Sequence, residues 1–330
     1  PNEENLTNAL LKVTRDEQKT IYFLEGHGEN QITSVENEGY QTAKKNLEQD
    51  GFLVKPLLLL KTGEVPEDAS VLVVAGPKKP IQAEEQKSIQ SYLDKGGAVM
   101  MLVDPQSKFG MEPFLKTWGI LLGGDIVIDP MSKLFGGDFA APVVNQYTVH
   151  DITSEFVLAT IFPIIQSVRG IPGSKIETVE LLKTSNNSWG ESDFESGAVK
   201  FDAGSDLKGP VPVAVVSTKL LETEKPHSKN IEPHEHKEPQ PKATLIVIGD
   251  SDFSNNRYSN FSGNGDFFLN TVSWLAEEEN LISIRPKERK NTPVHITRAW
   301  GTAIFVLGLL VFPGLVAGIG IRIWWKRRGL

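Results

Sequence analysis

The sequence KTIYFLEGHGEN, residues 19–30, contains a short apolar run that ends abruptly in glycine and charged residues. Its apolar part, residues 20–24, is typical of a buried β-strand, because β-branched and aromatic residues are enriched in strands. The glycines that follow permit a tight turn. We therefore predict that the chain leaves a sheet here and carries His27 and Glu29 at the strand exit.

The same pattern of strand, turn and helix continues over residues 20–128 and resumes over residues 243–284. Further strands are predicted in FLVKPLLLL, ASVLVVAGP, AVMMLVDP, GDIVID and ATLIVIGDSDF, and helices in YQTAKKNLEQDG, IQAEEQKSIQSYLDKGG, MEPFLKTWGI and NGDFFLNTVSWLAEEEN. Short apolar strands separated by helices indicate a parallel sheet that is covered by helices. The predicted fold class is therefore α/β, with Asp266 as the N-cap of the last helix.

The C-terminal end contains an uncharged segment, Ala299–Ile321, which is long enough to cross a bilayer core of about 30 Å. Trp300 lies at one end of it. Tryptophan and basic residues typical of membrane anchors lie at the other end, namely Trp324, Trp325, Lys326, Arg327 and Arg328. We predict a transmembrane helix here that includes Pro313, which membrane helices tolerate.

Charge is unevenly distributed along the chain. The net charge is −8, and because residues 298–330 contribute +5, residues 1–297 carry −13. An acidic body argues against a nucleic-acid partner. Basic residues flank both ends of the predicted transmembrane helix, but long folded domains translocate largely regardless of charge. We therefore expect a cytoplasmic (inner) membrane protein with its main domain on the extracytoplasmic, periplasmic side and its short tail in the cytoplasm.

Composition divides the chain further. Residues 130–220 are rich in Gly, Ser, Pro and Thr and are predicted to form a β-rich insertion or subdomain. Residues 221–242 are polar and proline-rich, which indicates an exposed, mobile loop. The remaining parts are expected to be the α/β domain in two pieces, 1–129 and 243–284, a juxtamembrane linker, 285–298, the transmembrane helix, 299–323, and a basic tail, 324–330. The chain begins at Pro1 without an apolar signal, so we expect a further segment upstream.

The sequence lacks the residues and motifs that several common enzyme mechanisms need. The chain has no cysteine, which excludes thiol nucleophiles, disulfides and thiolate-bound metals. No phosphate-binding loop, GxGxxG fingerprint or GxSxG elbow occurs. His227, His234 and His236 lie in the polar, proline-rich loop, so we interpret them as solvated rather than as a metal site. No metal or cofactor is predicted.

Polar residues gather at the predicted strand exits, where ligands bind in open parallel sheets. The candidate ligand or partner surface comprises His27, Glu29, Lys78, Asp104, Asp250 and Asp252. An imidazole beside a carboxylate could act as a base or a ligand. Each of these residues also has a structural interpretation, because glycine-rich turns and aspartate caps commonly follow strands.

Three blocks of the sequence resemble the GldG-like auxiliary family of ABC-type transport systems, best known from bacterial gliding machinery. They are IYFLEGHGE, VLVVAGPKKPIQAEEQKSIQSYLDKGGAVMMLVDP and IVIGDSDFSNN followed by GNGDFFLNTVSWLAEEENLISIRPK. The resemblance implies a flavodoxin-like core related to the glutamine-amidotransferase-like superfamily and to the N-terminal domain of some intraflagellar transport proteins. It also implies an ABC permease and ATPase as partners. Homo- or hetero-dimerisation with a related auxiliary subunit is a further hypothesis that the sequence leaves open. Amidotransferases of that superfamily use a cysteine nucleophile, which this chain lacks.

Three functions stay open at this point. The first is a non-enzymatic, membrane-anchored auxiliary subunit whose external domain binds a substrate, a partner or an envelope component. The second is a hydrolase or transferase that uses His27, Glu29 and Asp252, and it predicts a concave pocket at the strand exits. The third is a carbohydrate- or peptidoglycan-binding module in which Trp189 and Tyr147 stack on sugars.

Overall fold

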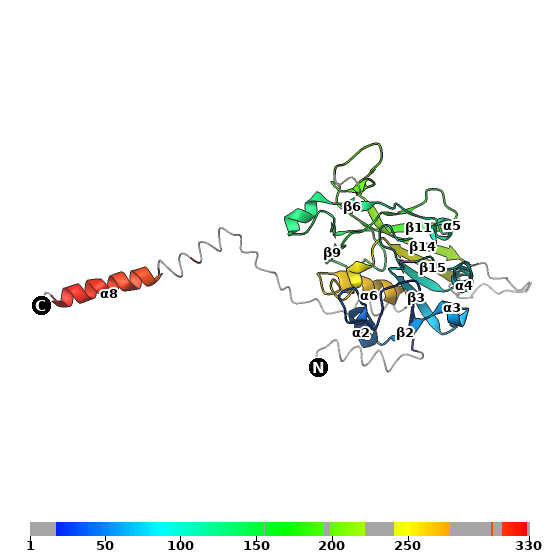
Figure 1. Ribbon diagram of the computed structural model, residues 1–330, viewed down its shortest axis with the longest axis horizontal. Helices are drawn as coiled ribbons and strands as arrows, with labels where there is room; N and C mark the ends of the chain where they lie inside the picture. The colour runs from blue at the N-terminus through cyan, green and yellow to red at the C-terminus, as the bar shows by residue number, and fades with distance from the viewer. Residues whose placement is uncertain are drawn as a thin grey trace, which may run out of the picture. The chain divides into compact units, whose positions relative to one another are not determined.

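The computed structural model describes residues 18–154, 156–194, 199–221, 241–277, 305 and 312–328. The chain divides into two units, residues 1–285 and residues 286–330. The first unit is built around one sheet of eight strands, in the order β2-β1-β3-β4-β15-β14-β11-β8 (Figure 1). These strands are β1 Thr20–Leu24, β2 Leu53–Leu57, β3 Ala69–Ala75, β4 Ala98–Leu102, β8 Gln146–Tyr147, β11 Glu177–Lys183, β14 Pro212–Leu220 and β15 Lys242–Ile248.

The predicted all-parallel, flavodoxin-like sheet is wrong, because the sheet is mixed. Strands β2, β1, β3, β4 and β15 are parallel to one another. Strand β14 is antiparallel to both β15 and β11, and β8 is antiparallel to β11. Leu220 at the end of β14 pairs with Lys242 at the start of β15, so these consecutive strands form a long hairpin, which requires antiparallel pairing.

Alternate residues of the parallel strands point to opposite faces of the sheet, and each face has its own apolar core. Phe23, Val73 and Met100 belong to one face, which packs against helices α2 and α6. Tyr22 and Met101 belong to the other face, which packs against helix α4. The helices and 3₁₀ helices of this unit are α2 Gln41–Gln49, α3 Leu59–Thr62, α4 Ala83–Asp94, α5 Glu112–Thr117, η1 Pro130–Phe135, η3 Asp252–Ser254 and α6 Asn264–Leu275.

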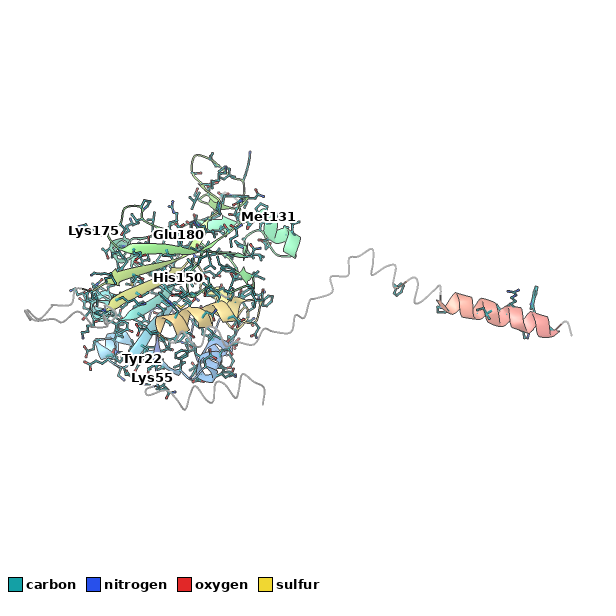
Figure 2. All side chains as sticks on the ribbon, turned by 180° about the vertical axis from the view of Figure 1, so that it is seen from behind. Tyr22, Lys55, Met131, His150, Lys175 and Glu180 are labelled. Atoms are coloured by element: carbon teal, nitrogen blue, oxygen red, sulfur yellow. The ribbon has the colours of Figure 1, made fainter. Side chains whose placement is uncertain are left out.

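At the free edge of the sheet, Tyr22 of β1 lies beside Lys55 of β2 in register (Figure 2). The Tyr22 hydroxyl donates to Asp68 at 2.9 Å, and Lys55 Nζ lies 3.0 Å from the same carboxylate. Desolvation by burial, followed by the bond to Asp68, raises the pKa of Tyr22.

Three small sheets hold the rest of the described strands. They are β5 Ile120–Leu122 with β10 Val168–Gly170, β6 Ile126–Ile128 with β12 Trp189–Glu191 and β13 Leu207–Lys208, and β7 Val143–Val144 with β9 Thr160–Ile161. The segment GDIVID was expected to be the fifth strand of the main sheet, but its strand β6 pairs with β12 instead. The expected N-cap of α6 is also corrected, because Gly263 precedes the helix and Asp266 lies in its first turn.

The second unit contains helix α8, Phe312–Arg328. Across the described residues, no helix is long and apolar enough to cross a membrane. This contradicts the predicted transmembrane helix over 299–323, of which residues 299–304 and 306–311 lie outside the described residues. Helix α8 begins beside Pro313, and a proline fits the first turn of a helix better than its interior.

Candidate functional site

The carboxyl ends of β1, β3, β4 and β15 lie at one edge of the sheet, because these strands are parallel. All six predicted site residues follow these strands: His27, Glu29, Lys78, Asp104, Asp250 and Asp252. The structure groups most of them into two hydrogen-bonded clusters that are largely buried, although Asp104 and Asp252 are only half-buried. Lys78 has an exposed side chain, and its charge lowers the pKa of Asp104 and Asp252 less than burial raises it.

The strand order reverses between β1 and β3, which is where a parallel sheet usually opens a crevice for ligands. Here the backbone of the protein bridges this position. The Asn30 amide donates to the Ala75 carbonyl at 2.8 Å, and the His27 carbonyl accepts from Lys78 N at 2.8 Å and Lys79 N at 2.9 Å. The loops after β1 and β3 are therefore bonded directly to each other.

His27, Glu29 and Glu85 form the first cluster, which we call the imidazole cluster. His27 Nδ1 lies 3.0 Å from Glu29 Oε1, and His27 Nε2 lies 2.8 Å from Glu85 Oε2. The Glu29 carboxylate also accepts from the His27 amide at 2.6 Å. All three residues are buried, with exposed fractions of 3% for His27, 7% for Glu29 and 2% for Glu85.

The imidazole cluster determines what His27 can do. Each ring nitrogen lies within hydrogen-bond distance of a carboxylate oxygen, so each already has a partner inside the protein. Neither nitrogen is free for a substrate or a metal. This arrangement favours a structural role, in which the β1 exit is fastened to the start of helix α4 through Glu85.

The second cluster comprises Asn30, Asp104, Asp250, Ser251 and Asp252, and we call it the aspartate cluster. Asp104 accepts from the Ser251 amide at 2.6 Å and from its hydroxyl at 2.9 Å. Asn30 Nδ2 donates to Ser251 Oγ at 3.1 Å. Asp250 Oδ1 accepts from the Asp252 amide at 2.7 Å, while Asp250 Oδ2 is buried without a hydrogen-bond partner among the described residues. Hydrogen bonds thus join the exits of β1, β4 and β15.

Burial changes the acidity of the aspartate cluster. Desolvation, strengthened by the charges of Asp104 and Asp252, raises the pKa of Asp250 well above its usual range. Burial also raises the pKa of Asp104, although the two bonds from Ser251 oppose it. Partial burial raises the pKa of Asp252. The cluster therefore favours a protonated, uncharged Asp250.

We expect the substitution Asp250→Asn to change how stability depends on pH. The pKa of Asp250 is higher in the folded than in the unfolded chain, so its stabilising contribution is complete below about pH 4 and is lost as the pH rises. Asparagine keeps an oxygen for the Asp252 amide and cannot ionise. In thermal unfolding from pH 4 to pH 8, the melting temperature of the variant should rise relative to that of the wild type. A difference that stays constant over this range would show that folding does not shift the pKa of Asp250, and one that falls would show that folding lowers it.

Several members of the two clusters were missed in the sequence. Glu85 had a local signal, because Gln82 and Glu85 form a capping box at the start of α4, but its bond to His27 spans 58 residues. Nothing in the sequence indicates the contact between Asn30 and Ser251, since the two residues are 221 residues apart. Their side chains meet only because β1 and β15 lie in the same parallel sheet.

The aromatic residues proposed for sugar stacking lie in different sheets. Tyr147 of β8 is half-buried, its hydroxyl donates to the Val144 and Leu158 carbonyls, and its ring packs edge-on against Phe156 at 5.1 Å. Trp189 of β12 is also half-buried, and its indole N–H donates to Glu191 at 3.1 Å. The structure does not bring these rings together in one sheet.

The other predicted residues fall partly outside the described chain. Trp324 and Trp325 of α8 are 53% and 72% exposed, and the Arg328 guanidinium lies 4.6 Å from the Trp324 ring centroid. Trp300 and the histidine-rich residues 227–236 lie outside the described residues. Within the described ranges, no group of three or more His, Asp or Glu residues is arranged to hold a metal ion.

Comparison with known proteins places these observations in a family. The model of a family described as an ABC-type uncharacterized transport system matches residues 18–271. Among solved structures, the mmIFT52 N-terminal domain has a TM-score of 0.55 at 15% identity, over 78% of this chain and 97% of that chain. A ThuA-like protein from Bacteroides uniformis has a TM-score of 0.44 at 14% identity, over 78% of this chain and 91% of that chain. No curated protein sequence matches this chain.

The two kinds of similarity carry different weight. At 15% identity, the likeness to the mmIFT52 domain shows the fold alone. The family match spans every strand of the central sheet and confirms the predicted resemblance to auxiliary transport proteins, without singling out its GldG-like members. The chain therefore belongs to the family of auxiliary components described as an ABC-type uncharacterized transport system.

Proposed function

We propose that this protein is a non-catalytic auxiliary subunit that works at the cytoplasmic membrane beside an ABC permease and its ATPase. Its described body would lie on the extracytoplasmic side and bind a substrate, a partner or an envelope component. The family match supports the auxiliary role. ATP hydrolysis would belong to another subunit, since the sequence contains no phosphate-binding loop.

The closed strand exits are the observation that carries the non-catalytic part of this proposal. A general base must reach the proton that it removes. His27 is 3% exposed, and both ring nitrogens contact carboxylates. The position where the strand order reverses is bridged by hydrogen bonds from Asn30, Lys78 and Lys79. These contacts favour a scaffold that presents a surface.

Purification of the full-length protein from its native membrane in mild detergent tests the proposal. We expect an ABC permease and its ATPase to be recovered with it in fixed proportion, as measured by quantitative mass spectrometry. ATP hydrolysis should accompany the complex and be absent from the isolated chain. Recovery of this protein alone, under conditions that keep other membrane complexes intact, would refute the auxiliary role.

A further inference from the structure

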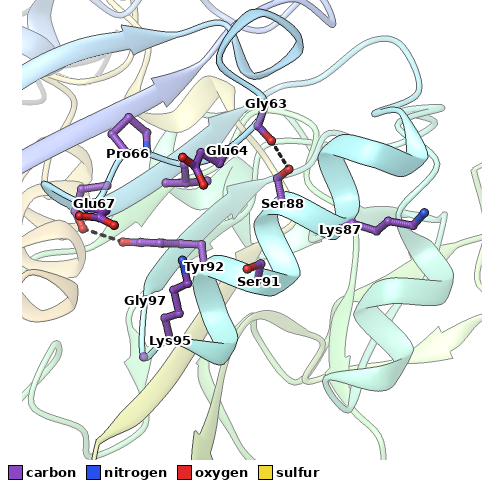
Figure 3. A pocket seen from close by; sticks show the side chains of 13 residues that line it. Gly63, Glu64, Pro66, Glu67, Lys87, Ser88, Ser91, Tyr92, Lys95 and Gly97 are labelled. Carbon is purple, nitrogen blue, oxygen red and sulfur yellow. Dashed lines mark hydrogen bonds between the residues drawn. The ribbon is translucent and has the colours of Figure 1, made fainter.

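A groove runs along the amino ends of the parallel strands, at the end of the sheet that lies opposite the candidate functional site. Its larger part, about 540 Å³, lies between residues 63–69 and helix α4 (Figure 3). Its smaller part, about 140 Å³, lies between the start of β4 and the end of α6. Ala69, Tyr92 and two glycines line both parts, so the two parts are adjacent. We call them together the N-edge groove.

Charged residues of opposite sign line the larger part of the N-edge groove. Glu64 and Glu67 belong to the loop wall, and Lys87 and Lys95 belong to the helix wall. None of the four forms an ion pair with a residue in the described ranges. Exposed charges are often simply solvated, but here opposite charges line one concave surface and do not neutralise each other. A ligand that carries both signs can satisfy both walls.

The middle of the N-edge groove is shaped by Gly96 and Gly97. A Cβ on Gly97 would lie 2.5 Å from Tyr92 Cε1, so the tyrosine ring packs directly on the backbone there. The Tyr92 hydroxyl donates to the Ala69 carbonyl at 3.1 Å, which fixes the ring as part of the wall (Figure 3). The groove therefore has a floor of backbone atoms beside a fixed aromatic ring. Such a surface suits an extended polypeptide better than a small molecule, because small-molecule sites are typically apolar pockets.

The position of the N-edge groove relates it to the rest of the chain. Lys19, which precedes β1, and Glu277, which follows α6, both line its smaller part. The Leu221 amide donates to the Pro241 carbonyl at 2.9 Å, and a Cβ on Gly96 would lie 3.7 Å from the Leu221 side chain. The described body thus connects to the segments before 18, across 222–240 and after 277 at this same edge.

From these observations we propose that the N-edge groove binds an extended polypeptide segment of a partner subunit of the transport complex. This segment would carry a basic side chain for Glu64 and Glu67 and an acidic side chain for Lys95. The proposal rests on the function proposed above and names the surface through which the complex forms. At the other end of the sheet, the carboxyl ends of the parallel strands are already linked by the hydrogen bonds of the imidazole and aspartate clusters.

Site-specific photocrosslinking tests the proposal in the full-length protein in its native membrane. The photoreactive residue p-benzoylphenylalanine replaces Ser91, an exposed residue of the helix wall, or Lys45, an exposed residue of α2 outside the groove. We expect a covalent adduct with the permease or a second auxiliary subunit from position 91 and none from position 45. If these subunits are recovered with the protein but position 91 forms no adduct, the groove is not the interface, although the auxiliary function stands. If no transport subunit is recovered at all, the function itself fails.

Charge reversal provides an independent measurement. The double substitution Glu64→Lys and Glu67→Lys should reduce recovery of the partner about tenfold, because like charges then face each other across the interface. Lys45→Glu on α2 is the matched control and should leave recovery unchanged. Unchanged melting temperatures would show that both proteins are folded. Full recovery of the partner by the folded double variant would overturn the proposal.

Discussion

Replacing His27 with alanine is expected to lower the free energy of unfolding by about 3–5 kcal/mol, the usual cost of removing one partner from a buried ion pair. The imidazole lies between two buried carboxylates, at 3.0 Å from Glu29 and 2.8 Å from Glu85. Without it both carboxylates stay buried and lose the partner that they share. A loss of this size is a large fraction of the roughly 5–15 kcal/mol by which domains are stable. Urea or thermal unfolding of the purified protein measures it.

The reason for this loss can be tested separately from its size. If the orphaned carboxylates cause it, the triple variant His27→Ala, Glu29→Gln and Glu85→Gln should recover part of the stability, because no unpaired charge remains. His150→Ala is a suitable control, since His150 is only half-buried and contacts the Trp274 ring at 4.7 Å. A loss below about 1 kcal/mol for His27→Ala, or a triple variant less stable than the single one, would contradict the charge argument.

The stretch around β1 shows how far the sequence can predict this structure. Its apolar run forms a buried strand and its glycines form the turn, because both depend on neighbouring residues. The helices α2, α4 and α5 also fall within their predicted segments. Local patterns therefore located the elements and the exit that carries His27 and Glu29.

The errors concern contacts between distant parts of the chain. Strand β15 was predicted and β14 lies in the region predicted to be β-rich, but nothing in either segment shows that they pair with each other and add an antiparallel half to the sheet. GDIVID was a correct strand in the wrong sheet for the same reason. At the candidate site, the sequence supplied His27 but not its second carboxylate, Glu85, whose local role is to cap α4. His27 and Glu29 looked available for chemistry, because the sequence does not show that Glu85 contacts His27.

Replacing Gly76 with alanine is expected to destabilise the fold by about 2–5 kcal/mol, from two separate causes. Gly76 has φ +66°, where an alanine is strained by about 1–2 kcal/mol. Its Cβ would also lie 2.6 Å from Ser251 Oγ, 3.1 Å from Asn30 Nδ2 and 3.2 Å from Asp104 Oδ2. The new methyl group would therefore push apart the aspartate cluster that joins three strand exits.

Gly124 separates the two causes, because it has the same φ of +66° and a Cβ added there would meet no described atom within 4 Å. Gly124→Ala should therefore show the backbone strain alone, about 1–2 kcal/mol. The excess loss in Gly76→Ala measures the crowding of the aspartate cluster. It should shrink when Ser251→Ala is added, because the hydroxyl at 2.6 Å is then absent. Equal losses for the two glycines would mean that the cluster yields without cost, and that the strand exits are held together by the backbone bonds between their loops instead.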